Sequence, residues 1–334
     1  MVHDPSPFRS ILVPLDGSPL AEQAVPLAAS IAQRARGKLH LTLVHQLGSA
    51  PVDAAAARLF TSIELATRKS ERAYLRGVQA RLREGGTRLS SAVTLTGAPG
   101  SELAQYVRDV GIDLVVMATH GRGGLRRAWL GSVADYLIRA LEVPVLLVRP
   151  REGGPAPARP PAVGEVLVSL DGSPLAEEAL GPATALARIW DAEVVLLQVV
   201  PPVLLGTDPA LPLPSTYDEE LTTTCRQQAQ DYLDDIVERM HGQGLRSTGV
   251  AVVGWNPADA ILNVARPERV AVVALATHGR GGLRRLVLGS VADKLVRGAD
   301  VPVLVYRPTG GAKTRRQSTA RGSARGRVAA RGAK

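Results

Sequence analysis

Two aspartates in repeated motifs could bind a ribose hydroxyl or a phosphate-bound Mg²⁺ through carboxylate oxygens. Asp16 and Asp171 lie in the octapeptide Leu-Asp-Gly-Ser-Pro-Leu-Ala-Glu, which occurs unchanged at 15–22 and at 170–177. The alternative is structural, because Asp-Gly is also a common tight turn. Repetition of this block together with a second one favours a shared chemical role for the two aspartates.

The second repeat supplies residues that could hold phosphate groups. Residues 118–139 and 276–297 are identical at 18 of 22 aligned positions. Glycines in each copy let backbone N–H groups approach an anion, and a Gly-Ser pair then opens a helix whose N-terminus favours phosphate. Arg122, Arg126 and Arg127 could form a positive rim. Ser132 and Asp135 also fit a helix capping box, a structural role that is compatible with phosphate binding.

Strands and helices must carry both repeats to one edge of a sheet. Apolar runs predict strands at 10–15, 39–44, 91–96, 113–118 and 143–148, and at 166–170, 194–199, 248–253, 270–276 and 301–306. Helical spacing predicts helices in the first unit at 20–35, 62–84, 101–110 and 132–141. This alternation is typical of an α/β fold with a doubly wound parallel sheet. The motifs follow the first and fourth strands, so a crevice between those strands is the expected nucleotide site.

The repeats are offset by 155 and 158 residues, so the 334-residue chain consists of two tandem units. We divide it into a first domain, a linker, a second domain and a basic tail, at 8–150, 151–162, 163–308 and 309–334. The apolar fifth strand of each unit should be an edge strand. We expect these two strands to pair within the chain, and two chains to associate as a homodimer.

One segment of the second unit has no clear counterpart in the first. Residues 201–215 are rich in Pro and Leu, whereas the first unit is Ala-rich before its long helix. We predict a flap over the sheet here.

Charge and composition limit the classes of partner. The net charge is +9, but the tail holds eight Lys or Arg and no Asp or Glu, which leaves +1 for the rest. The tail is interpreted either as a segment that contacts nucleic-acid phosphates or as a solvated tail without a partner. A single cysteine, Cys225, suits a reducing compartment. No signal-peptide pattern or membrane-length apolar run is found, so we expect a soluble cytoplasmic protein without membrane contact.

The ordered set of motifs resembles the universal stress protein family. Its nucleotide loop reads Gly-x-x-Gly, nine residues, Gly-Ser/Thr, and Gly121 precedes Gly131 and Ser132 by this spacing. The first strand also ends in a similar way, with Val-Pro-Leu-Asp at 13–16. The resemblance covers 8–150 and 163–308. It implies two five-stranded sheets of strand order 3-2-1-4-5, as in adenine nucleotide alpha-hydrolase-like folds, which bind ATP with Mg²⁺ held through the phosphates.

The resemblance also implies the position of the nucleotide in each unit. Gln46 and Val199, after the second strands, would meet adenine through backbone atoms. Ala118 and Ala276 replace the first glycine of the family pattern and put a methyl group at the closest backbone approach. The residues expected to bind the cofactor are Pro14, Asp16, Gln46, Ala118, Gly121, Arg122, Gly131, Ser132, Val133, Asp171, Val199, Ala276, Gly279, Arg280, Gly289, Ser290 and Val291.

Other reactive side chains receive structural interpretations. His120 and His278 occupy equivalent loop positions without metal-ligand partners in sequence, so shaping the loop or lining the phosphate is favoured over catalysis. His45 aligns with Gln198, which argues against an essential role, and Cys225 is expected to be a buried or inert thiol. The chain lacks a P-loop lysine motif and a kinase catalytic set. We therefore expect an ATP-binding stress or signalling protein, with slow ATP hydrolysis or nucleic-acid binding through the tail as alternatives.

Overall fold

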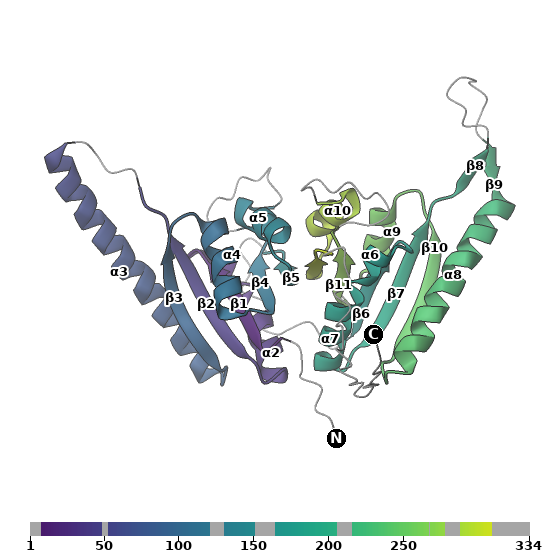
Figure 1. Cartoon of the computed structure of the whole chain (residues 1–334), viewed down its shortest axis with the longest axis horizontal. Coiled ribbons are helices and arrows are strands. Elements are labelled where there is room, and N and C mark those ends of the chain that lie inside the picture. The colour runs from purple at the N-terminus through teal and green to yellow at the C-terminus, as the bar shows by residue number, and fades with distance from the viewer. Residues whose placement is uncertain are drawn as a thin grey trace, which may run out of the picture.

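The protein is described by a computed structural model over residues 8–48, 53–120, 130–150, 164–205, 216–266, 268–277 and 288–308. A ten-stranded sheet runs through both units in the order β10-β7-β6-β11-β12-β5-β4-β1-β2-β3 (Figure 1). The first unit contributes β1 (Ser10–Leu15), β2 (Lys38–His45), β3 (Leu89–Thr96), β4 (Leu114–Ala118) and β5 (Val145–Val148). The second contributes β6 (Glu165–Leu170), β7 (Glu193–Val200), β10 (Ser247–Val253), β11 (Val270–Ala276) and β12 (Val303–Tyr306).

Each unit has the strand order 3-2-1-4-5, and the strands within a unit pair in parallel. This confirms two tandem doubly wound units, which share one continuous sheet instead of forming two separate ones. The strands pair in parallel with helices on both sides because the strands are apolar on both faces. In β1, Ile11 and Val13 pack into one buried cluster while Leu12 packs into another on the opposite face. A strand buried on both faces needs helices on both, and parallel crossovers supply them.

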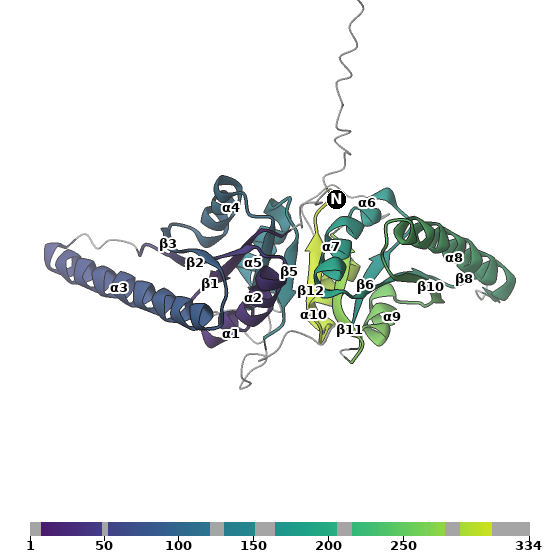
Figure 2. The same ribbon diagram turned by 90° about the horizontal axis from the view of Figure 1, so that it is seen from below.

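The helices divide between the two faces of the sheet. One apolar cluster includes buried residues of α2 (Val25–Arg34), α3 (Ala54–Glu84), α7 (Leu180–Trp190) and α8 (Glu219–His241). The other cluster includes buried residues of α4 (Pro99–Val110), α5 (Ser132–Ala140), α9 (Pro257–Val264) and α10 (Ser290–Gly298). The strand order leaves β3 and β10 as the two outermost strands. The long helices α3 and α8 pack beside them at opposite ends of the molecule (Figures 1 and 2).

The two units join through their fifth strands, as expected. β5 and β12 are antiparallel, and Leu146 faces Leu304 with both side chains almost fully buried. Figure 2 shows these two strands side by side at the middle of the molecule. The guanidinium of Arg307 also donates a hydrogen bond to the main-chain oxygen of Arg139 across the junction. Pairing removes one open edge from each unit and leaves only the outer edges of β3 and β10.

Two helix predictions are wrong in detail. The helix expected at 20–35 is divided into α1 (Pro19–Glu22) and α2, and the second unit repeats the break with α6 (Pro174–Glu177) before α7. Pro26 explains the break in the first unit, because proline has no N–H to continue the helical hydrogen bonds. The long helix predicted from 62 instead begins at Ala54, where the carboxylate of Asp53 accepts a hydrogen bond from the N–H of Ala56 at 2.8 Å. Its first turns carry few buried side chains, so the helical periodicity is weak there.

Part of the segment expected to be a flap is a β-ribbon. β8 (Val203–Leu205) pairs with β9 (Thr216–Asp218) in an antiparallel two-stranded sheet beside the start of α8. Residues 206–215 of the predicted flap lie outside the described residues, as do the glycine-rich loops at 121–129 and 278–287, the linker and the tail. Within the described ranges, no helix combines the length and apolar character needed to cross a bilayer.

Candidate functional site

The site is built where the direction of strand order reverses. β1 lies between β2 and β4, and its register places Ile11 beside Leu114. In the second unit, β6 lies between β7 and β11 in the same way. Crossovers leave such a strand pair in opposite directions, so a crevice opens beyond the carboxyl ends of the two strands. Asp16 and Thr119 follow β1 and β4 directly, and both therefore lie at this edge.

The two aspartates are held by the same local hydrogen bonds in both units. One carboxylate oxygen of Asp16 accepts from the N–H of Ser18 at 2.9 Å and from its hydroxyl at 2.6 Å. The corresponding distances from Asp171 to Ser173 are 3.0 and 2.6 Å. Each serine then caps the following short helix. The aspartates are half-buried. The hydrogen bonds from the serines orient their carboxylates before any ligand arrives.

The Asp-Gly pair is also a turn, as the structural alternative required. Gly17 and Gly172 have φ angles of 83° and 78°, in the left-handed region that favours glycine. The turn and a binding role are compatible, because the turn is what directs the aspartate toward the end of the strand. The two interpretations of this motif therefore do not exclude each other.

The N-termini of α5 and α10 come unusually close to the ends of β4 and β11. Gly131 donates its N–H to the main-chain oxygen of Thr119 at 2.8 Å, and Gly289 to that of Thr277 at 3.0 Å. A Cβ atom would lie 3.1 Å from that oxygen at Gly131 and 2.8 Å from it at Gly289. Because 2.8 Å is too short for a carbon–oxygen contact, Gly289 requires a residue without a side chain, while Gly131 leaves a tight contact. The glycines bring a helix N-terminus to the crevice.

The capping-box interpretation of the next residue is wrong. Gly131 is the N-cap of α5, so Ser132 is the first helical residue and its side chain is exposed at the helix start. Asp135 pairs with Arg139 at 2.6 Å, one turn further along. Ser290 has the same position in α10. An exposed hydroxyl at the first position of each helix is available to a ligand.

The remaining site residues fall into two groups. Pro14 and Ala118 are buried at the strand ends, while Ala276, Val133 and Val291 are half-buried. The other group, comprising Gly121, Arg122, Gly279 and Arg280, lies outside the described residues, together with Gly123, Gly124, Arg126, Arg127 and His278. The described part of the site therefore consists of an aspartate, two strand ends and a helix N-terminus in each unit.

Strand register corrects the alignment of the two adenine positions. Leu43 pairs with Leu15, and Gln198 pairs with the equivalent residue, Leu170. Gln198 is therefore the counterpart of Leu43, and Val200 is the counterpart of His45. The sequence alignment was displaced by two residues at this strand, because a pattern of apolar residues alone does not fix register. Gln46 and Val199 consequently do not occupy equivalent places, although both lie near the carboxyl edge.

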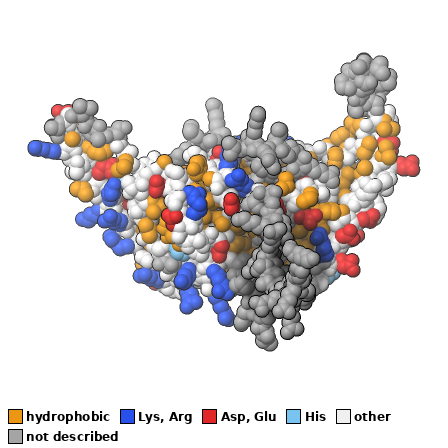
Figure 3. All heavy atoms as spheres, in the orientation of Figure 1, with side chains coloured by type: hydrophobic (Ala, Val, Ile, Leu, Met, Phe, Trp, Pro, Cys, Tyr) orange, Lys and Arg blue, Asp and Glu red, His pale blue; other side chains and the backbone are white. Residues whose placement is uncertain are grey.

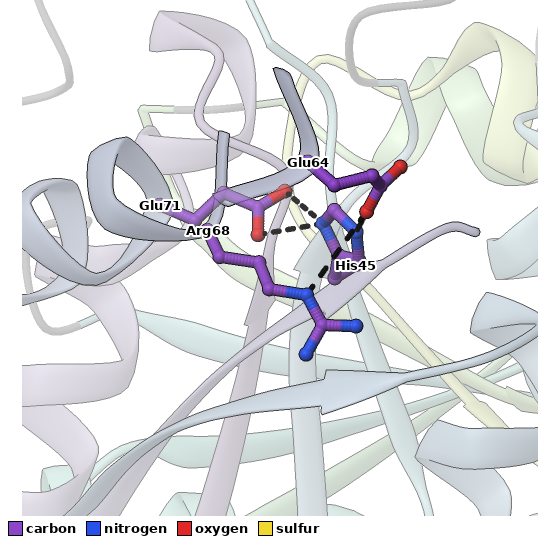
Figure 4. Close-up of polar contacts among 4 residues, drawn as sticks. All are labelled: His45, Glu64, Arg68 and Glu71. Atoms are coloured by element: carbon purple, nitrogen blue, oxygen red, sulfur yellow. Dashed lines mark hydrogen bonds and ion pairs between the residues drawn. The ribbon is translucent and has the colours of Figure 1, made fainter. Parts of the chain in front are cut away.

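His45 is part of a charged cluster that sequence reasoning missed. The imidazole is buried at the end of β2, and Figure 4 shows it between two glutamates of α3. Its Nδ1 atom lies 3.0 Å from Glu71, and its Nε2 atom lies 2.5 Å from Glu64. Arg68 approaches Glu64 at 4.0 Å. The seven-residue spacing of the two glutamates on one helix face was the available signal, but only the fold brings a histidine between them.

The geometry indicates that His45 is an imidazolium ion. Carboxylates only accept hydrogen bonds, so each ring nitrogen must donate. Burial by itself lowers the pKa of His45, but hydrogen bonds to Glu64 and Glu71 and their negative charges outweigh it and raise the pKa above 6.5. The cluster joins α3 to β2 next to Gln46 and has no equivalent among the described residues around Val200.

Other reactive side chains have ordinary surroundings. His120 is half-buried, and its Nδ1 atom lies 2.9 Å from the hydroxyl of Thr119; the loop that it was expected to shape lies outside the described residues. Cys225 is half-buried on α8 rather than fully buried, and it forms no disulfide. Over the described residues, no group of three His, Cys, Asp or Glu side chains is arranged to bind a metal ion.

Comparison with known proteins agrees with this architecture. A sequence model of the universal stress protein family matches residues 7–149 and again 163–307. Universal stress protein Rv2005c of Mycobacterium tuberculosis is 31% identical over 199 residues, which cover 58% of this chain and 62% of that protein, less than two thirds of its length.

Two further matches extend over nearly the whole chain. Universal stress protein Mb2019 of Mycobacterium bovis is 28% identical over 319 residues, or 89% of this chain and 94% of that protein. A universal stress protein structure from Archaeoglobus fulgidus aligns with a TM-score of 0.62 and 18% identity, over 89% of this chain and 96% of that one. The tandem arrangement of two such units is therefore found in other members.

Proposed function

Because the chain belongs to the universal stress protein family, we propose that each of its units binds one ATP molecule and that nucleotide occupancy regulates contacts with other macromolecules. The site in each unit would be the crevice between the first and fourth strands. The observation that carries the proposal is the duplicated approach of a helix N-terminus to a strand end, made possible by Gly131 and Gly289.

The described residues fit a nucleotide with a triphosphate. Unpaired N–H groups at the start of α5 and α10 favour phosphate, and the helix dipole adds to that preference. Ser132 and Ser290 would donate a hydroxyl hydrogen bond to it. Asp16 or Asp171 would accept from the ribose or bind a Mg²⁺ ion, which supplies positive charge against the phosphates. The backbone after β2 or β7 would meet adenine, near Gln46 and Val199.

Calorimetric titration with ATP and Mg²⁺ tests this function. We expect two binding sites per chain in the native protein. Asp16→Asn should weaken one site, Asp171→Asn the other, and the double variant both. Asp109→Asn is a matched control, because Asp109 is exposed at the end of α4 and away from the strand ends. Absence of ATP binding heat in the native protein, or equal heat in the double variant and the native protein, would refute the proposal.

The proposal extends to the domain organisation, the cellular location, the self-association and the tail of the chain. We take 8–150 and 163–308 as two tandem domains joined by the linker, in a cytoplasmic protein whose chains self-associate as a homodimer. The tail at 309–334, with eight basic and no acidic residues, would contact nucleic-acid phosphates weakly. Truncation after Pro308 tests the tail: DNA binding in low salt should be lost, and binding that persists unchanged would assign it to another surface.

A further inference from the structure

The two outermost helices are equivalent in position but opposite in charge. Arg81 of α3 pairs with Glu22, and Arg239 of α8 pairs with Glu177, so the same contact ties each helix to its unit. Seven Lys or Arg against three Glu give α3 a net charge of +4. Six Asp or Glu against two Arg give α8 a net charge of −4. Equivalent helices of one repeated fold thus carry opposite charges.

The positive charge of α3 is concentrated on one face. Buried residues such as Leu75 and Val78 define the side that packs on the sheet. At 3.6 residues per turn, five basic residues project within a narrow sector on the outer side. All five are exposed, and none forms an ion pair with a described residue; we call them the basic face: Arg58, Lys69, Arg72, Arg76 and Arg83.

The negative charge of α8 is arranged in the same way. Leu233, Ile236 and Met240 are buried against the sheet. The outer side carries five exposed carboxylates, which we call the acidic face: Glu220, Asp231, Asp234, Asp235 and Glu238. Two of these accept hydrogen bonds from glutamine amides of the same helix, and none pairs with a cation among the described residues. The acidic face is therefore not neutralised within its own unit.

The two faces cannot meet within one chain. α3 and α8 lie at opposite ends of the ten-stranded sheet, beside β3 and β10 (Figure 1). Figure 3 shows Lys and Arg side chains along the α3 end and Asp and Glu side chains along the α8 end. Complementary surfaces at opposite ends of one molecule fit a second copy placed head to tail.

A continuous sheet between copies is disfavoured by a side chain on α8. The amide of Gln230 donates to the main-chain oxygen of Gly249 at 2.9 Å and accepts from the N–H of Ala251 at 2.9 Å. These are main-chain groups of the outer strand β10. Because Gln230 occupies them, β10 offers fewer open groups to a strand of another molecule. At this end of the sheet, the helix α8 is therefore the surface that another copy can contact.

We propose that copies of this chain self-associate head to tail, the basic face of α3 in one copy docking on the acidic face of α8 in the next. Any solution of the protein contains both faces at equal concentration. Such a heterologous contact leaves one unused face of each kind on the pair, so association continues with concentration unless a ring closes. The proposal does not depend on nucleotide binding.

Sedimentation velocity of the full chain over a concentration series tests the proposal. We expect the sedimentation coefficient to rise with protein concentration. The rise should be lost when salt goes from about 0.1 M to about 1 M, because the Debye length falls from about 10 Å to about 3 Å. A coefficient that is independent of concentration in low salt would overturn the proposal.

Charge reversal assigns the surfaces. Arg72→Glu/Arg76→Glu reduces the charge of the basic face from +5 to +1, and Asp235→Lys/Glu238→Lys reduces that of the acidic face from −5 to −1. Each variant alone should weaken self-association more than about tenfold. An equal mixture of the two should restore association between unlike chains, because the unaltered acidic face of one variant meets the unaltered basic face of the other. The matched control is Arg34→Glu/Arg88→Glu, which reverses two exposed arginines outside α3 and should leave association unchanged.

Three outcomes would refute head-to-tail docking. Self-association that survives both reversals places the contact elsewhere. If only the acidic-face variant loses self-association, the acidic face binds another cation, such as the basic tail, and not the basic face. Two weakened variants that do not recover on mixing would mean that the faces do not contact each other. Circular dichroism of each variant separates these results from misfolding.

Discussion

The two units agree closely at their binding edges and differ at their outer ends. The carboxylate of Asp16 or Asp171 accepts from the next serine at nearly the same distances in both units, and each site glycine donates to a threonine oxygen. The outer helices, by contrast, carry opposite charges, and among the described residues a β-ribbon lies beside only one of them. Main-chain geometry restricts the residues at the switch point, whereas exposed helix positions accept either charge at little cost to folding.

The largest expected difference between the units concerns His45. His45→Val copies Val200 of the second unit and removes two charge-assisted hydrogen bonds. We expect the free energy of unfolding of the first unit to fall by about 3 kcal/mol near pH 6. Urea unfolding of the variant and the native protein measures the loss. A variant as stable as the native protein would show that the cluster contributes nothing net.

The same histidine should make the first unit sensitive to pH. Its pKa is raised in the folded state, because hydrogen bonds to Glu64 and Glu71 outweigh the effect of burial. The stabilisation is therefore fully present below about pH 6.5, the ordinary pKa, and is lost as pH rises through the folded-state pKa. His45→Val should remove this dependence. Unfolding midpoints at a series of pH values that change in parallel for both proteins would contradict the assignment.

The two site glycines should respond unequally to a methyl group. Gly289→Ala places a Cβ 2.8 Å from the oxygen of Thr277, while Gly131→Ala places one 3.1 Å from that of Thr119. Both φ angles suit alanine, so the effect isolates the steric contact. We expect losses of about 2 kcal/mol for Gly289→Ala and below about 1 kcal/mol for Gly131→Ala. The ATP titration should show the same order, and equal effects would contradict the geometry.

A smaller effect of opposite sign is expected at Gln198. Its side-chain oxygen is buried and has no hydrogen-bond partner among the described residues, and its counterpart in the first unit is Leu43. Gln198→Leu should raise the free energy of unfolding of the second unit by about 1 kcal/mol. The reverse change, Leu43→Gln, should lower that of the first unit. If Gln198→Leu destabilises the protein, the amide has a partner that matters.

The smallest effect is expected where the units agree in an exposed ion pair. Arg81→Ala and Arg239→Ala each remove one contact to a glutamate, and both arginine side chains are about 60% exposed. Water screens such pairs, so each variant should lose less than about 1 kcal/mol by urea unfolding. A large loss in one variant only would show that this contact differs between the units.

Local patterns in the sequence predicted most of the strands, because the central ones are short apolar runs with both faces buried. They failed where a single residue overrides the pattern, as Pro26 does in dividing α1 from α2. They also failed where a helix has little buried face, as at the start of α3, where few side chains are buried. Apolar periodicity arises where one face of a helix is buried, so an exposed helical segment shows only a weak periodic pattern.

By itself the sequence determined the duplication, the two sets of site motifs and the alternation of strands and helices. These follow from residue identity and from spacing along the chain. Only the tertiary structure decided that Val200 replaces His45, that Glu64 and Glu71 enclose that histidine, and that oppositely charged helices end the sheet. Such relations depend on strand register and on contacts between distant segments, which packing of the whole sheet fixes and local spacing does not.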